Sequence, residues 1–406
     1  MSRPLTRRQF GRLGLTAFAA SLVGCGPGNR YSQRDIAALE QQRRLEAEAA
    51  GHGPFGKLSF QGYRGLAELP WFELDEHGHL RLKIDDLPPG IDFHAHLGFN
   101  LLFAPDFDLL KKTENIHYLL DCDRGTPPCT LDLDTYINSA FDEQRHEELE
   151  HEFIAQLTWG SEAATTHTIP NLAAELDEVR FAQAAILPID AGLPFRDNPT
   201  ARWMDAIARS GHSDRFIPFA SVHPRDSDKR EKLREFAAAG ARGVKLHPEM
   251  QRFFPDDDGA MEIYEECGRL GLPIIFHCGR SGIEPERIRP YPLPRWFAAP
   301  ALTFPKVQFV LGHAGARDGD EAIALAKRFD NVWLEITGQG VTMLDRMMRE
   351  VGSERLLFGS DWPFYPLAAT LAKVLIVSDR QPQVRAAILR DNALRCFATA
   401  RAGQGA

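Results

Sequence analysis

The chain has 406 residues, of which 44% are hydrophobic, so it can bury a large core. Charged residues make up 25%, which is ordinary for a soluble globular protein. The formal net charge of -9 argues against a nucleic-acid-binding surface, and we expect no nucleic-acid partner. Length alone allows two or three domains, but α/β barrels of this size often form a single domain.

Residues 1–24 are predicted to be an export signal. A basic start, M-S-R-P-L-T-R-R-Q-F-G-R, precedes an apolar stretch too short to span a bilayer well. The pair Arg7-Arg8 resembles a twin-arginine signal, and L-V-G-C, ending at Cys25, resembles a bacterial lipobox. We therefore expect a lipid anchor at Cys25 and a location on the periplasmic side of a bacterial membrane. The alternative is an ordinary signal cut nearby, or an uncut signal anchor.

Two small segments are expected before the main fold. Residues 25–57 are predicted to be a helical linker, because the stretch 33–50 is rich in Ala, Leu, Glu, Arg and Gln. This helix either tethers the folded part to the membrane or packs on its outside. Residues 58–90 are predicted to form a small β cap, since two alternating runs flank a turn at Glu76–Gly78.

From Ile91 onward, short apolar runs alternate with amphipathic helical segments. The strands are predicted at 91–96, 183–189, 216–222, 242–247, 273–278, 307–312, 332–336 and 356–361. Eight such alternating units indicate a TIM (β/α)8 barrel over residues 91–400. A doubly wound open sheet is the alternative, but no G-x-G-x-x-G sequence follows any of these strands.

A long insertion follows the first strand. Residues 97–182 contain predicted helices near 133–158 and 171–182. Insertions after barrel strands lie on the catalytic face, so this segment is expected to act as a lid over the site. Within it, Cys122 and Cys129 lie seven residues apart in a proline-containing loop. The sequence leaves open whether they form a disulfide or stay as two thiols.

Polar residues stand where the apolar strands end. The relevant sequences are I-D-F-H-A-H (His94, His96), G-V-K-L-H-P (Lys245, His247), I-I-F-H-C-G (His277), V-L-G-H-A-G (His313) and L-F-G-S-D-W-P (Asp361). Side chains at one end of a parallel barrel converge on its axis, and that end carries catalysis in such folds. Converging imidazoles and a carboxylate predict a metal site there.

These motifs resemble the amidohydrolase superfamily. The likeness is to the amidohydrolase-related branch, which includes aminocarboxymuconate-semialdehyde decarboxylase and various lactone and ester hydrolases. It covers roughly residues 91–400, including the closing D-N-A-L-R-C-F. The resemblance implies that His94, His96, His277 and Asp361 bind one divalent metal, with zinc expected and manganese as an alternative. It also implies that His313 orients the substrate or stabilises negative charge, and that Asp361 takes a proton from metal-bound water.

The role of Lys245 stays open. Two-metal members of the superfamily carry a carboxylated lysine at the end of the fourth strand, where Lys245 lies, whereas the G-V-K-L-H-P sequence resembles the single-metal branch. Lys245 is thus a candidate for a second metal or for a substrate carboxylate. His247 shares its face and either reaches the pocket or packs at the strand end.

Three further residues are candidates for substrate binding. Arg280 follows His277 closely and could bind an anionic group with two hydrogen bonds, or form a surface salt bridge instead. His223 ends the third strand, and Trp362 follows Asp361. The alternatives are a hydrogen-bonded loop histidine and a packed indole.

The sequence therefore predicts a metal-dependent hydrolase, in which metal-bound hydroxide attacks an amide, ester or lactone carbonyl of a small molecule. One alternative is a metal-dependent decarboxylase of the same branch, and another is a non-catalytic metal-binding lipoprotein. Barrels of this kind often pair, so a homodimer is an alternative to a monomer, although no interface is readable in the sequence.

Overall fold

The computed structural model describes residues 30–49, 55–99, 107–193 and 198–404. The predicted signal segment 1–24 and Cys25 lie outside these residues. Within them, no helix combines the length and the apolar character needed to cross a membrane.

The parallel strands lie where the sequence predicts them. They are β4 (Gly90–Ala95), β6 (Phe181–Ile186), β7 (Phe216–Pro218), β8 (Val244–Leu246), β9 (Ile274–His277), β10 (Phe309–Gly312), β11 (Val332–Glu335) and β12 (Leu356–Leu357). One sheet has the order β4-β6-β7 and the other β12-β11-β10-β9-β8. Isolated parallel bridges join the two sheets at both edges, Ala95 to Trp362 and Ala220 to Val244. The described strands therefore follow one another around a TIM barrel.

A β-bulge in β4 aims two histidines into the barrel. The pairing of β4 with β6 shifts register between Asp92 and Ala95. Phe93 belongs to the core inside the barrel, yet the next residue, His94, also joins the cluster of residues at the strand ends. An extra residue in a strand re-aims the side chains that follow it. Asp92 is held in place because it accepts hydrogen bonds from the backbone N–H groups of His94 and Ser360.

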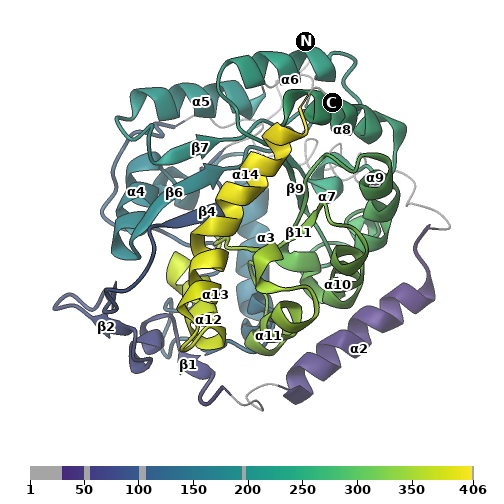
Figure 1. Cartoon of the computed structure of the whole chain (residues 1–406). Helices are drawn as coiled ribbons and strands as arrows, with labels where there is room; N and C mark the ends of the chain where they lie inside the picture. The colour runs from purple at the N-terminus through teal and green to yellow at the C-terminus, as the bar shows by residue number, and fades with distance from the viewer. Residues whose placement is uncertain (1–29, 50–54, 100–106, 194–197, 405–406) are drawn as a thin grey trace, which may run out of the picture.

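Apolar side chains fill the barrel and close its amino-terminal end. The inner core contains residues from most of the strands together with residues of the last helix, α14 (Asn392–Ala402). The rings of Phe93 and Phe397 lie 5.1 Å apart between centroids, so α14 covers this end. Figure 1 shows α14, in yellow, crossing the barrel. The opposite, carboxyl-terminal end of the strands is left for polar residues.

Helices surround the strands (Figure 1). After the insertion they are α5 (Pro199–Arg209), α6 (Lys229–Ala238), α7 (Pro248–Gln251), α8 (Asp258–Leu270), α9 (Ala298–Thr303), α10 (Gly319–Arg328), α11 (Val341–Glu350), α12 (Leu367–Val377) and α13 (Pro382–Ala386). Their apolar faces pack on the sheet; in α8, for example, Ile263, Tyr264 and Cys267 are buried.

The amino-terminal segment and the insertion pack together. The extension contains α2 (Gln33–Ala49), β1 (Ser59–Gln61) and the predicted hairpin, formed by β2 (Phe72–Leu74) and β3 (Leu80–Leu82). The insertion contains β5 (Thr130–Asp132), α3 (Glu143–Leu157) and α4 (Ile169–Glu178). β1 pairs with β5 in antiparallel fashion, and a disulfide joins Cys122 to Cys129. The helix α2 lies on the outside of the barrel (Figure 1).

Candidate metal centre

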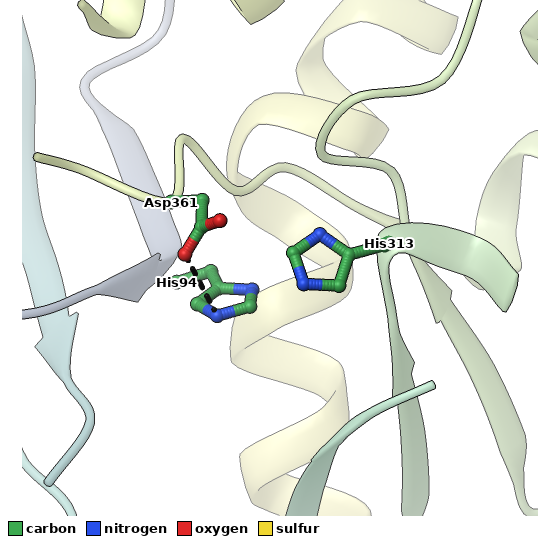
Figure 2. Close-up of side chains that lie close together, drawn as sticks. All are labelled: His94, His313 and Asp361. Carbon is green, nitrogen blue, oxygen red and sulfur yellow. Dashed lines mark ion pairs between the residues drawn. The ribbon is translucent and has the colours of Figure 1, made fainter. Parts of the chain in front are cut away.

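The strand ends bring two imidazoles and a carboxylate together. Ligand atoms of His94, His313 and Asp361 all lie within 4.8 Å of one another, and all three residues are buried. Figure 2 shows the three side chains facing one another from different strand ends. Nε2 of His94 and Nε2 of His96 each lie 3.3 Å from Oδ1 of Asp361. Three of the predicted ligands, His94, His96 and Asp361, are therefore neighbours.

The backbone is unusual at two of these residues. His313 has a φ of 56° and Asp361 a φ of 57°. Residues other than glycine rarely adopt such left-handed values, and where they do the positions cluster at functional sites. In both cases the chain turns sharply after the strand, which places the side chain at the barrel mouth.

His94 of β4 and His96, the residue after β4, each have an oxygen close to Nδ1, the ring nitrogen that faces away from Asp361. Nδ1 of His94 lies 2.7 Å from Oε2 of Glu335, and Nδ1 of His96 lies 2.7 Å from the carbonyl oxygen of Leu187. An acceptor at Nδ1 favours the proton there, which leaves the Nε2 lone pair of each ring directed at Asp361. The two rings are thus oriented as metal ligands.

The carboxylate of Glu335 accepts hydrogen bonds from several residues of the centre. One carboxylate oxygen accepts from His94 and from the backbone N–H of His313 (3.1 Å), and the other accepts from the N–H of Thr337 (2.7 Å) and from its hydroxyl. Burial raises the pKa of Glu335 to about 7, although the hydrogen bonds from Thr337 and from the backbone of His313 act against the shift. A Cβ at Gly359 would lie 2.2 Å from this carboxylate, so only glycine leaves room for it.

His277 lies beside His313. Its Nδ1 is 3.1 Å from Nε2 of His313, and its Nε2 is 3.4 Å from Oε2 of Glu249. The ring of His247 stacks on it, with centroids 4.4 Å apart and planes within 4° of parallel. His277 therefore contacts His313 of the cluster directly, whereas His247 contacts His277 and lies one residue further from the cluster.

Lys245 is buried at the end of β8 and approaches His94. Its Nζ lies 3.1 Å from Nε2 of His94, so the lysine and a metal ion would compete for the same lone pair. Burial lowers the pKa of Lys245 to about 8. Burial also lowers the pKa of His94 well below its usual value, and the nearby charge of Lys245 adds to the effect. His94 is thus neutral at neutral pH, which leaves one of its ring nitrogens with a free lone pair.

The three substrate-binding candidates have partners away from the cluster. Arg280 is buried and forms an ion pair with Asp318. Its guanidinium also donates to the backbone carbonyl of Asp35, at the start of α2. Nδ1 of His223 accepts from the backbone N–H of Arg225 (3.1 Å). Substrate contact by these residues stays a prediction.

Trp362 has a structural partner in the insertion. It is fully buried, and its indole N–H donates to Oε2 of Glu175, on α4 of the insertion (2.7 Å). The tryptophan that follows Asp361 thus fastens the insertion to this edge of the barrel.

Glu335 and Glu249 are site residues that the sequence analysis did not single out. Glu335 ends an apolar strand, V-W-L-E, in the same way as the predicted ligands end theirs, and that pattern could have identified it. Glu249 lies in the short helix α7 after His247, where no periodic pattern marks it.

The residues present fit a divalent metal ion. Nδ1 of His313 is buried at the centre and has no hydrogen-bond partner among the residues that the structure describes. Buried polar atoms of this kind call for an explanation, and a bound ion is one. Imidazole and carboxylate ligands suit zinc, manganese and iron.

The chain matches a known protein family. The family model described as amidohydrolase matches residues 91–398, and the chain belongs to this family. The match begins at the first residue of the I-D-F-H-A-H motif and ends within α14.

Several solved structures share the fold. A 5-carboxyvanillate decarboxylase from Novosphingobium aromaticivorans, complexed with manganese and 4-hydroxy-3-methoxy-5-nitrobenzoic acid, has 16% identity and a TM-score of 0.51 over 76% of this chain and 96% of its own. A probable 2-pyrone-4,6-dicarboxylic acid hydrolase from Acinetobacter baumannii has 16% identity and a TM-score of 0.46 over 77% and 100%. An amidohydrolase from Burkholderia multivorans with bound zinc has 16% identity and a TM-score of 0.46 over 59% and 92%.

Proposed function

We propose that this protein is a metal-dependent hydrolase that acts on an amide, ester or lactone carbonyl of a small molecule. The observation that carries the proposal is the convergence of His94, His313 and Asp361 at the carboxyl-terminal end of the barrel, with ligand atoms within 4.8 Å. His96 adds a further nitrogen, 3.3 Å from the same carboxylate. In this fold, that end is where catalysis takes place.

His94, His96, Asp361 and one nitrogen from the His277–His313 pair would hold the metal. A divalent ion there supplies a Lewis acid, which polarises a carbonyl and lowers the pKa of a water molecule. Zinc is the ion we expect, and manganese is the alternative.

Asp361 has the position for proton transfer. Its carboxylate lies beside the imidazoles at the mouth of the barrel and can accept a proton from the attacking water and return it to the leaving group. Glu335 holds the ring of His94 and the backbone of His313 in place, so neither has to reorganise during the reaction. The insertion, fastened through Trp362 and Glu175, keeps bulk water from this end.

Decarboxylation of a small aromatic or unsaturated acid is the second candidate. The observation that favours it is the fold match, at a TM-score of 0.51, to a manganese-containing decarboxylase. A decarboxylase needs a cation near the substrate carboxylate, and the sequence offers Arg280 and Lys245. Arg280 is engaged by Asp318 and the carbonyl of Asp35, so Lys245, next to His94, is the remaining candidate for this task.

We also propose that the protein is exported and anchored to a bacterial membrane through Cys25. The sequence of residues 1–25 is the main support. The disulfide between Cys122 and Cys129 adds to it, since such bonds persist in oxidising compartments. Labelling with a radioactive fatty acid, lost in Cys25→Ser, tests the anchor; no label in the unmodified protein contradicts it.

The function is tested by metal content and product analysis. Purified protein is loaded with zinc or manganese, and metal per chain is measured by elemental analysis for the unmodified protein and for His94→Ala. His151→Ala is the matched control, because His151 is an exposed residue of α3. We expect about one metal ion per chain, lost in His94→Ala and kept in the control.

The loaded protein is then given esters, lactones, amides and aromatic carboxylic acids. Formation of a new carboxylic acid that contains oxygen from labelled water supports hydrolysis. Release of CO2 instead supports decarboxylation. Absence of metal from the unmodified protein, even after incubation with both ions, contradicts both functions.

A further inference from the structure

The starting point is the buried carboxylate of Glu249, which the proposed mechanism does not use. Glu249 lies on α7, directly after the strand that carries Lys245, and it is 5% exposed. Its Oε2 lies 3.4 Å from Nε2 of His277, and its Oε1 has no hydrogen-bond partner within the described part of the chain. A buried carboxylate beside an imidazole at a candidate metal centre calls for a functional explanation.

The first possibility is a second metal site. Ligand atoms of His247, Glu249 and His277 lie within 4.8 Å of one another. The rings of His247 and His277 are stacked, however, with planes within 4° of parallel and centroids 4.4 Å apart. An imidazole binds a metal in the plane of its ring, and parallel planes do not meet. The two lone pairs therefore do not converge on one ion, and the group is not a metal site in this arrangement.

The second possibility follows from the two nitrogens of His277. Its Nδ1 faces the main cluster, 3.1 Å from His313, and its Nε2 faces Glu249. A neutral imidazole carries one N–H and one lone pair. A carboxylate near Nε2 attracts the proton to Nε2, which leaves the lone pair of Nδ1 for the metal centre.

The other two histidine ligands are held in the same way. Nδ1 of His94 faces Glu335, Nδ1 of His96 faces the carbonyl of Leu187, and in both rings the opposite nitrogen faces Asp361. Histidine ligands in metalloproteins commonly donate their other N–H to such an oxygen, which fixes both the tautomer and the ring orientation. Glu249 supplies the corresponding oxygen for His277.

We propose that Glu249 is a positioning residue for His277: it holds the proton on Nε2 and directs Nδ1 to the metal centre, while the stacked ring of His247 prevents the imidazole from turning. The proposal rests on the metal-dependent function proposed above. The Nε2–Oε2 pair is 3.4 Å apart and not aligned as a hydrogen bond. The terminal torsion of a glutamate is broad, so the carboxylate has freedom to turn toward Nε2.

The test compares Glu249→Leu and Glu249→Gln with the unmodified protein. In the metal-free proteins, the histidine tautomers are assigned from two-bond ¹⁵N–¹H correlation spectra, with His277→Gln used to assign the signal. We expect the Nε2–H tautomer of His277 in the unmodified protein and its loss in Glu249→Leu. Glu249→Gln should retain the tautomer, because its amide oxygen still accepts from Nε2–H.

Zinc affinity is then measured by competition with a chelator. We expect Glu249→Leu to weaken binding about 10- to 100-fold and Glu249→Gln to restore much of it. Retention of the Nε2–H tautomer in Glu249→Leu, or unchanged zinc affinity, overturns the proposal. Loss of one of two bound zinc ions also overturns it, since Glu249 would then be a ligand. If the unmodified protein binds no zinc, the proposed function fails, whereas the tautomer measurement still decides the role of Glu249.

Discussion

Glu335 offers the sharpest test of how the centre is built. In Glu335→Gln, one oxygen becomes an NH2 group. In the unmodified protein both carboxylate oxygens of Glu335 face N–H donors. Oε2 faces the N–H groups of His94 and His313, and Oε1 faces the N–H of Thr337. Whichever way the amide is turned, its NH2 group therefore meets a donor. If the NH2 group faces His94, the ring can accept from it only by moving its proton to Nε2, the nitrogen that faces Asp361, and the N–H of His313 still loses its acceptor.

The size of the effect follows from the bond that is lost. A hydrogen bond to a charged group contributes about 1.5–3 kcal/mol, which corresponds to roughly 10- to 150-fold in an equilibrium constant. We therefore expect the zinc affinity of Glu335→Gln to fall by about 10- to 100-fold, the range seen when such outer partners are removed. Because the pKa of Glu335 is raised to about 7, the comparison belongs at pH 8, where the carboxylate is ionised.

The assay is competition for zinc with a chromophoric chelator. Glu266→Gln is the matched control, because Glu266 is a buried carboxylate that pairs with Arg234 and Arg269, away from the centre. Zinc affinity within twofold of the unmodified protein in Glu335→Gln, or an equal loss in the control, would refute the reasoning.

Two predictions concern stability. Asp318→Asn leaves the charge of the buried Arg280 unpaired and should lower the free energy of unfolding in urea by about 3–5 kcal/mol. The control Asp320→Asn breaks a more exposed pair and should cost less than about 1 kcal/mol, and equal losses would contradict the argument. Burial lowers the pKa of His167 to about 4, so below pH 6.5 the unfolded chain binds a proton that the folded protein does not, and stability falls as the pH drops toward 4. Glu, Asp and metal-site groups titrate in the same range, so the variant His167→Gln isolates this histidine; its amide can still donate to the carbonyl of His117. In metal-free protein, the variant should reduce the slope of the unfolding free energy against pH by up to about 1.4 kcal/mol per pH unit. Equal slopes for the two proteins in urea titrations would show that His167 is not the source.

The barrel could be predicted from the sequence because its signals are local. Each strand is a short apolar run that ends at a polar residue or a turn, and the predicted strands coincide with the observed ones to within a few residues. The polar strand ends also identified His94, His96, His313 and Asp361, which lie together. Local pattern is enough here, since the fold itself brings strand ends to one place.

The remaining features depend on contacts between distant segments. The bulge in β4 changes which side of the strand faces inward, and no alternation pattern predicts it. The partner of Arg280 is Asp318 on the next β/α unit, with additional contacts to the amino-terminal segment. Glu249 acquires its place from the position of His277 in space rather than from its own neighbours in the sequence.

Because β1 pairs with β5, the residues that fold together extend beyond the residues that match the family model. The family match starts at Ile91, but Leu58, Phe60 and Leu66 are buried in the same core as the barrel residues. A protein shortened to the family boundary would expose these contacts and leave β5 of the insertion with an unpaired edge. Substitutions in residues 58–66 would therefore loosen the insertion as well as the amino-terminal segment, without changing any barrel residue.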